Sequence, residues 1–78
     1  MINRLIRVFQ KEGDDFLSEV ILKDVTLEEL QKLFNIEKSN PMYDCYPVTE
    51  KQKCFLEGKA NISIDLDSYD YFVEADEV

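Results

Sequence analysis

The alternation of apolar and polar residues predicts a β-hairpin at the start of the chain. Residues 4–10 (RLIRVFQ) place Leu5, Arg7 and Phe9 on one face of a strand and the intervening side chains on the other. The segment 11–15 (KEGDD) holds a turn-forming glycine, and residues 16–23 (FLSEVILK) again have the composition of a strand. We therefore expect two antiparallel strands joined by this turn.

The period of the pattern changes in residues 25–35 (VTLEELQKLFN), where large apolar residues recur at helical spacing. Thr26 and Glu29 are placed to form a capping box, and Val25 with Leu30 a hydrophobic staple. This segment is predicted to be the main helix of the protein.

The middle of the chain predicts shorter elements. Residues 36–41 (IEKSNP) form a loop, and residues 42–48 (MYDCYPV) fit a short strand with its proline near the end. A second capping pattern, Thr49 with Gln52, opens a helix of about two turns over residues 49–58, which Gly58 would end.

The last part of the chain returns to alternation. Residues 59–66 (KANISIDL) and 69–75 (YDYFVEA) predict two strands of a second hairpin, with residues 67–68 as a tight turn. The order ββα(β)αββ is typical of an α+β fold. We expect a single small domain over residues 1–78, an antiparallel sheet of four to five strands with one main helix packed on one face. The opposite face is then partly exposed, where a partner could dock.

Composition points to a small protein of the cytoplasm. The chain has 78 residues and is 45% hydrophobic, which suffices for one core. No apolar run approaches the roughly 20 residues of a membrane span, and residues 1–13 lack the pattern of a signal peptide. In the cytoplasm, Cys45 and Cys54 are expected to be reduced, small, buried apolar groups.

Negative charge is concentrated at the end of the chain. The net charge is −8, and residues 60–78 contain six acidic side chains and no lysine or arginine. An acidic solvated face keeps a small protein soluble, but ordinary surfaces mix both signs, and like charges across a hairpin cost free energy. The balance argues against direct binding of nucleic acid and in favour of a basic protein partner. These acids are Asp65, Asp67, Asp70, Glu74, Asp76 and Glu77.

The sequence offers little catalytic chemistry. It contains no histidine, which removes the commonest general base and the Ser-His-Asp and Cys-His sites. Two cysteines are too few for a zinc site, and the spacing of Asp65, Asp67 and Asp70 fails the calcium-loop pattern, where a glycine belongs at the place of Asp70. We expect no enzyme, no cofactor and no metal, with a carboxylate pair as the remaining catalytic alternative.

The aromatic residues divide into two groups. The five phenylalanines are expected in the core, whereas Tyr43, Tyr69 and Tyr71 fit either the core or a binding surface, where tyrosines surrounded by charge act as anchors. The phenylalanines are Phe9, Phe16, Phe34, Phe55 and Phe72.

The order of segments and the motif IDLDSYDYFVEAD at residues 64–76 resemble the cloacin-type immunity proteins of ribonuclease bacteriocins. The likeness runs along most of the chain and includes FQKEGDDF, EELQKLFNI and YDCY. It implies a small acidic cytoplasmic protein without a membrane segment that binds the basic nuclease domain of its cognate toxin and keeps it from RNA. The system would be a bacteriocin or a contact-dependent or other polymorphic toxin.

The resemblance also implies a binding site for that nuclease on the acidic sheet face. Its specificity position, a cysteine in the family, falls on Met42 here, with Cys45 displaced. Two other functions remain open, an acidic regulatory module with a non-nuclease partner and an enzyme; the oligomeric state is open too. The implied partner-binding residues are Asp44, Asp65, Asp67, Asp70, Tyr71 and Glu74.

Overall fold

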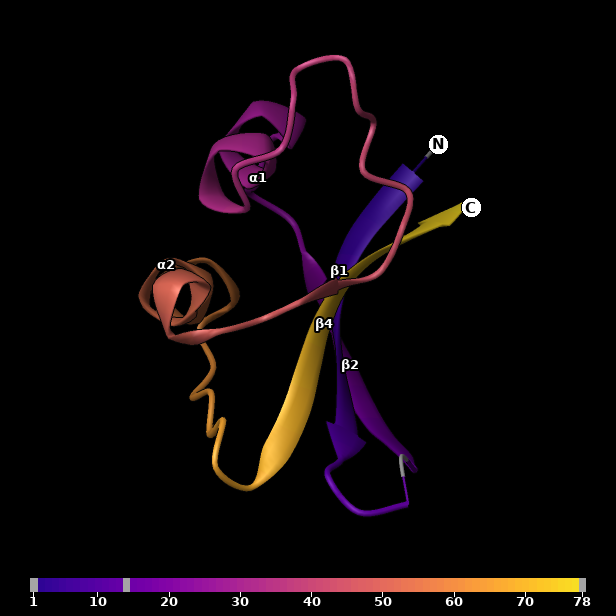
Figure 1. The fold of residues 1–78 in the computed structure, drawn as a ribbon, viewed down its shortest axis with the longest axis vertical. Helices are drawn as coiled ribbons and strands as arrows, with labels where there is room; N and C mark the ends of the chain where they lie inside the picture. The colour runs from indigo at the N-terminus through magenta and orange to yellow at the C-terminus, as the bar shows by residue number, and fades with distance from the viewer. Residues whose placement is uncertain (1, 14, 78) are drawn as a thin grey trace.

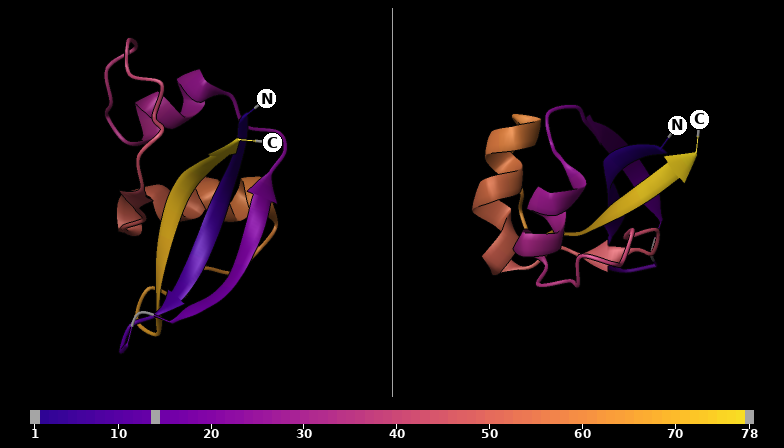
Figure 2. Two further views of the ribbon diagram at one scale, coloured as in Figure 1. Left: turned by 90° about the vertical axis from the view of Figure 1, so that its right-hand side faces the viewer. Right: turned by 90° about the horizontal axis from the view of Figure 1, so that it is seen from above.

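The protein is built in two layers, a sheet and a pair of helices. The computed structural model describes residues 2–13 and 15–77. Both helices lie on one face of an antiparallel four-stranded sheet with the strand order β2-β1-β4-β3 (Figures 1 and 2). This arrangement confirms the predicted α+β class and its antiparallel sheet.

The described part of the chain forms six elements, in the order ββαβαβ. They are β1 (Ile2–Gln10), β2 (Phe16–Leu22), α1 (Leu27–Leu33), β3 (Tyr46–Pro47), α2 (Glu50–Ala60) and β4 (Tyr69–Glu77).

The first and last strands lie side by side in the centre of the sheet. β1 pairs with β2 on one side, as the predicted hairpin requires, and with β4 on the other. The β1–β4 ladder runs the full length of both strands, from Ile2 opposite Glu77 to Gln10 opposite Tyr69. The two ends of the chain therefore lie near each other at one end of the molecule (Figure 1).

The predicted second hairpin is wrong. β4 is a strand, but the neighbours of β4 are β1 and β3, and residues 62–65 carry no ladder. Two backbone N–H groups of this segment donate to side chains and not to a neighbouring strand. Ile64 N–H donates to the Glu57 carboxylate at 2.7 Å, and Asp65 N–H donates to the Tyr71 hydroxyl at 3.0 Å. Alternation in a sequence indicates an extended backbone but does not say which strand it will pair with.

Both predicted capping boxes are present and set where the helices begin. Thr26 Oγ1 accepts from Glu29 N–H at 3.1 Å while the Glu29 carboxylate accepts from Thr26 N–H at 2.9 Å. At the start of α2, Thr49 N–H donates to Gln52 Oε1 at 2.8 Å, which completes the reciprocal pattern. Each pair satisfies donors that a helix leaves without partners in its first turn.

Two boundaries differ from the sequence pattern. α2 passes through Gly58 and ends at Ala60, and the cap residue Asn61 adopts the left-handed conformation with φ of 54° that asparagine tolerates well. The middle strand shrinks to Tyr46–Pro47, with the proline at its end as predicted. Proline lacks the donor that a longer ladder needs.

The core lies between the helices and the inner face of the sheet. Ile6 and Val73 of the sheet meet Leu30 of α1 and Leu56 of α2 in one buried cluster. The loop between α1 and β3 contributes Met42, which is 1% exposed although its φ of 56° is unusual for a residue with a side chain. Burial of these side chains is the main favourable term in folding.

Leu56→Ala is expected to lower the free energy of unfolding by about 2–5 kcal/mol, because the truncation leaves a cavity at a fully buried position. Urea denaturation followed by circular dichroism measures this change. Lys51→Ala, at an exposed position of the same helix, serves as the control and should stay within about 0.5 kcal/mol. Equal losses in both variants would mean that Leu56 does not belong to the core.

Candidate protein-binding face

The sheet face opposite the helices is bare in the described part of the chain. Seen from that side, the three long strands stand in front and α2 crosses behind them (Figure 2). We call this surface the open face; strand alternation and register place eleven residues of the three long strands on it. They are Asn3, Leu5, Arg7 and Phe9 of β1, Phe16, Glu19 and Ile21 of β2, and Asp70, Phe72, Glu74 and Asp76 of β4.

Arg7 occupies the centre of the open face and is shared by three carboxylates. Its Nη1 lies 2.6 Å from Glu74 Oε1 and its Nε 3.3 Å from Glu19 Oε1, and Nη2 contacts Asp76. The hydrogen bond with Glu74 is the largest cause that raises the pKa of Arg7, which therefore stays charged. One guanidinium thus ties β1 to both of its neighbouring strands.

An aromatic row crosses the same three strands. Phe9 meets Phe16 of β2 and Phe72 of β4 edge-on, each with ring centroids 5.7 Å apart. The expectation that all five phenylalanines lie in the core is therefore wrong for these three, and Phe16 is 53% exposed. Phe34 and Phe55 do pack against the core as predicted. Alternation puts the three on the bare side, whereas their hydrophobicity alone suggested burial.

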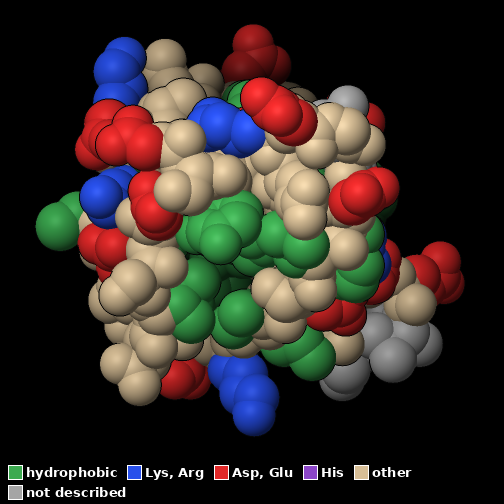
Figure 3. Space-filling view, turned by 90° about the horizontal axis from the view of Figure 1, so that it is seen from below, with side chains coloured by type: hydrophobic (Ala, Val, Ile, Leu, Met, Phe, Trp, Pro, Cys, Tyr) green, Lys and Arg blue, Asp and Glu red, His purple; other side chains and the backbone are tan. Residues whose placement is uncertain are grey.

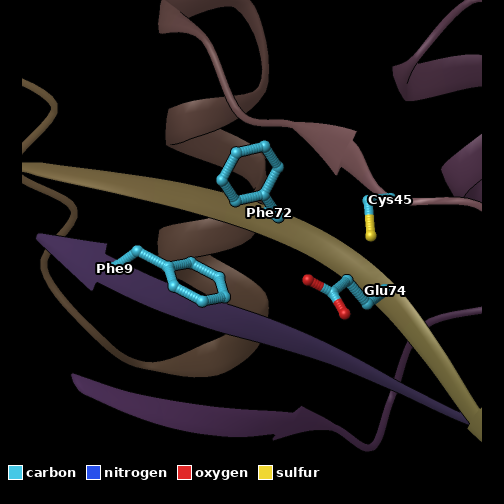
Figure 4. A pocket seen from close by; sticks show the side chains of 4 residues that line it. All are labelled: Phe9, Cys45, Phe72 and Glu74. Atoms are coloured by element: carbon cyan, nitrogen blue, oxygen red, sulfur yellow. The ribbon is translucent and has the colours of Figure 1, made fainter. Parts of the chain in front are cut away.

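A shallow pocket of about 350 Å³ lies between this row and the edge of the open face. Phe9 and Phe72 form one side of it, and Glu74 and Cys45 the other (Figure 4). Cys45 is exposed as a residue, but partial desolvation of its thiol at the pocket wall raises the pKa of that thiol, and the neighbouring Glu74 carboxylate raises it further. The pocket combines aromatic walls with a carboxylate, a lining that suits a cationic side chain.

The cysteines are free, as expected, but they are not buried. Cys45 and Cys54 are both exposed and unpaired. The prediction that they act as small buried apolar groups is wrong, because Cys45 borders the open face and Cys54 lies on the solvent side of α2.

Three of the six expected partner-binding residues gather at the open face. Asp70 and Glu74 belong to it, and Asp44 lies at its edge, close enough to Cys45 for its charge to act on the thiol. Asp70 is also paired, because Lys11 Nζ lies 3.1 Å from its carboxylate.

Asp65 and Asp67 lie elsewhere, in the loop that leads into β4. Asp65 accepts hydrogen bonds from Asp67 N–H and from Ser68, and the Ser68 hydroxyl is the largest cause that lowers the pKa of the Asp65 carboxyl. Asp67 is exposed beside the β1–β2 turn, where it shares a hollow with Lys11 and Glu12. This pair therefore forms a separate acidic loop at the end of the molecule opposite the chain ends.

Tyr71 belongs to the core and not to the open face. It is 6% exposed, it lies on the helix side of β4, and its hydroxyl accepts from Asp65 N–H. Its expected role in binding is corrected to a core role. The aligned specificity position, Met42, is likewise buried.

The other two tyrosines are more accessible. Tyr69 is exposed at the border of an apolar hollow of about 390 Å³, and hydrophobic side chains gather around a hollow at that end of the molecule (Figure 3). Tyr69 lies on the same side of β4 as Tyr71 and therefore faces away from the open face. Tyr43 contacts the Arg4 guanidinium, with 5.8 Å between the guanidinium carbon and the ring centroid.

The acidic residues of β4 are less repulsive than their one-signed sequence suggested. Arg7 of β1 and Lys11, which directly follows β1, neutralise part of the charge of Asp70, Glu74 and Asp76. The open face still carries four carboxylates, including Glu19, against these two cations. Its net charge remains negative, but much smaller than that of an unpaired acidic hairpin.

Sequence reasoning missed several residues of the open face. Arg7, Glu19 and Asp76 were not singled out, although alternation already grouped Arg7 with Phe9. The missing information was that β4 pairs with β1, since only this register brings Asp76 and Glu74 to the guanidinium.

Within the described residues, no group of three or more potential metal ligands is placed to hold an ion. No helix in that part of the chain is both long and apolar enough to cross a membrane.

These features define a class, a small α+β domain with one bare acidic and aromatic sheet face. The chain matches the model of a family described as a domain of unknown function (DUF7683) over residues 3–74, and it belongs to that family. No curated protein sequence matches it.

Arg7→Met is expected to lower the free energy of unfolding by about 2 kcal/mol, because it leaves three neighbouring carboxylates without their common partner. The loss should shrink as salt is added, since screening weakens the remaining repulsion. Urea titrations at low and high salt measure both effects. Lys11→Met, which removes one exposed pair, should cost less than about 1 kcal/mol. A salt-independent loss would argue that Arg7 acts through packing alone.

Alkylation of Cys45 is expected to be slow at neutral pH, because the raised pKa of its thiol leaves little of the reactive thiolate. In a Cys54→Ser background, mass spectrometry across a pH series gives the rate and its midpoint. Glu74→Gln should lower that midpoint, whereas Asp44→Asn, which removes the weakest contribution, should lower it less. Equal midpoints in all three proteins would contradict this assignment.

Proposed function

We propose that this protein is an immunity protein that binds and neutralises a basic toxin nuclease, with a ribonuclease as the expected toxin. The observation that carries the proposal is the open face, where carboxylates outnumber cations and large apolar side chains stay exposed beside them. A bare sheet face with apolar side chains in contact with water is typical of an interaction site.

The charge distribution fits a basic partner. The net charge of −8 would attract a cationic domain and raise the rate of encounter, which reaches about 10⁸–10⁹ M⁻¹s⁻¹ in electrostatically steered pairs at low salt. Asp44 at the edge of the open face and the acidic loop, Asp65 and Asp67, are exposed to act in this step.

The aromatic row supplies the short-range part of the interaction. Phe16, Phe9 and Phe72 form a connected apolar strip, and the pocket next to it ends at the Glu74 carboxylate. A lysine or arginine of the toxin could stack on the rings beside the Glu74 carboxylate, which also pairs with Arg7. By analogy with the cloacin-type proteins, such binding blocks access to RNA, and the protein acts in the cytoplasm without catalytic activity of its own.

A second candidate is an acidic regulatory module with a basic partner that is not a nuclease. The open face fits such a partner equally well, because charge and aromatic anchors do not encode the partner's chemistry. The neighbouring gene distinguishes the two functions. A toxin gene directly upstream supports the immunity function, and the absence of such a gene favours the regulatory module.

A pull-down with tagged protein from the native strain tests the proposal directly. At low salt the protein should recover a basic polypeptide with a nuclease domain. Adding the free protein should inhibit the activity of that nuclease. Recovery of partners without nuclease activity, or of none, would overturn the immunity function.

Asp70→Lys should slow association with the recovered partner about tenfold at low salt, because it reverses a charge on the open face. Stopped-flow fluorescence gives the rate. Glu28→Lys changes the net charge equally but lies exposed on α1, on the helix side, so its effect should be smaller. Equal effects of both variants would place the contact outside the open face.

A further inference from the structure

The two edges of the sheet are built very differently. β3, at one edge, is two residues long and contains Pro47, so it offers almost no ladder to another strand. β2, at the other edge, has seven residues and pairs only with β1. Its outer backbone groups have no neighbouring strand in the described part of the chain.

β2 has only part of the protection that edge strands usually carry. Glu19 turns toward Arg7 and the ladder is irregular at Leu17, but residues 16–22 contain no lysine, arginine or proline. Three of its side chains are exposed large hydrophobic groups, Phe16 at 53%, Leu17 at 41% and Ile21 at 47%. A long apolar edge of this kind is a template for pairing with another strand.

We propose that β2 pairs antiparallel with β2 of a second copy of this chain, with Ile21 opposite the partner's Ile21. This register sets Val20 opposite the partner's Leu22 on the helix side. On the open face, it sets Glu19 opposite the partner's Lys23, and the Glu19 side chain, 44% exposed, would then lie between Arg7 and that lysine. Lys23 directly follows β2, is exposed, and takes part in no ion pair among the described residues.

Other symmetric registers fit less well. Residues that lie opposite each other must point to the same face of a continuous sheet. The two-fold axis therefore passes between the two copies of one residue, which lie opposite each other. An axis at Glu19 would oppose two carboxylates, and an axis at Val20 would leave Lys23 without an acid opposite. The Ile21 register pairs residues 19–23 and so avoids the irregularity in the β1–β2 ladder at Leu17.

Charge favours a second copy over a basic partner at this edge. Glu19 and Lys23 cancel locally, whereas the excess acid lies on β4 and its preceding loop. A basic strand would gain more at the open face than here. Because the axis stands perpendicular to the sheet, pairing joins two four-stranded sheets into one and leaves both open faces on the same side. The proposal does not depend on the toxin.

Sedimentation equilibrium of the full chain tests the pairing through Ile21. The wild type should show a concentration-dependent monomer–dimer equilibrium. Ile21→Glu and Ile21→Lys, each alone, should dimerise at least about tenfold more weakly, because like charges then face each other across the axis. An equimolar mixture of these two variants should recover the dimer, since opposite charges meet. Tyr43→Glu, at an exposed aromatic outside the sheet, should behave as wild type.

Lys23→Glu provides a second test that leaves the strand interior untouched. It brings two carboxylates together in the proposed register and should also weaken dimerisation, with circular dichroism confirming that the fold persists. A wild type that stays monomeric at all concentrations would overturn the proposal. So would dimers that none of these variants weaken, a mixture without recovery, or an edge that takes up a basic peptide strand instead.

Discussion

The ladder between β1 and β4 is the constraint on which the rest of the structure depends. It joins the two ends of the chain over the full length of both strands. Ile6, Val73 and Tyr71 then form one inner surface for the helices, and Arg7 faces Glu74 and Asp76 on the other side. Closing such a long loop costs entropy, which only many simultaneous contacts can offset.

The same ladder explains why the last strand tolerates its acids. Like charges concentrated on a strand would repel one another if that strand paired with a second acidic segment. β4 pairs instead with β1, the strand that carries Arg7 and precedes Lys11, and each cation meets a carboxylate across the ladder. The acidic end of the chain is therefore partly neutralised by its beginning, and a moderate negative excess remains on the open face.

The helices divide the sheet into a structural and an accessible side. α1 and α2 cover the inner face with leucines, and no described residue forms a second layer on the opposite face (Figure 2). What stays exposed is apolar in part and acidic in part, and the proposed interactions with a basic partner and with a second copy use different regions, the face and the β2 edge.

Local rules in the sequence determined the first hairpin, both capping boxes and the fold class, because turn residues, caps and periodicity act over a few residues. They also indicated that one sheet face would be free. Tertiary structure decided the rest. It unpaired residues 62–65, buried Tyr71, exposed Phe16 and Cys45, and assembled the cluster around Arg7. The missing partner of residues 62–65 and the cluster around Arg7 follow from the pairing of β4 with β1. Strand partners distant in sequence leave no local pattern from which they can be predicted.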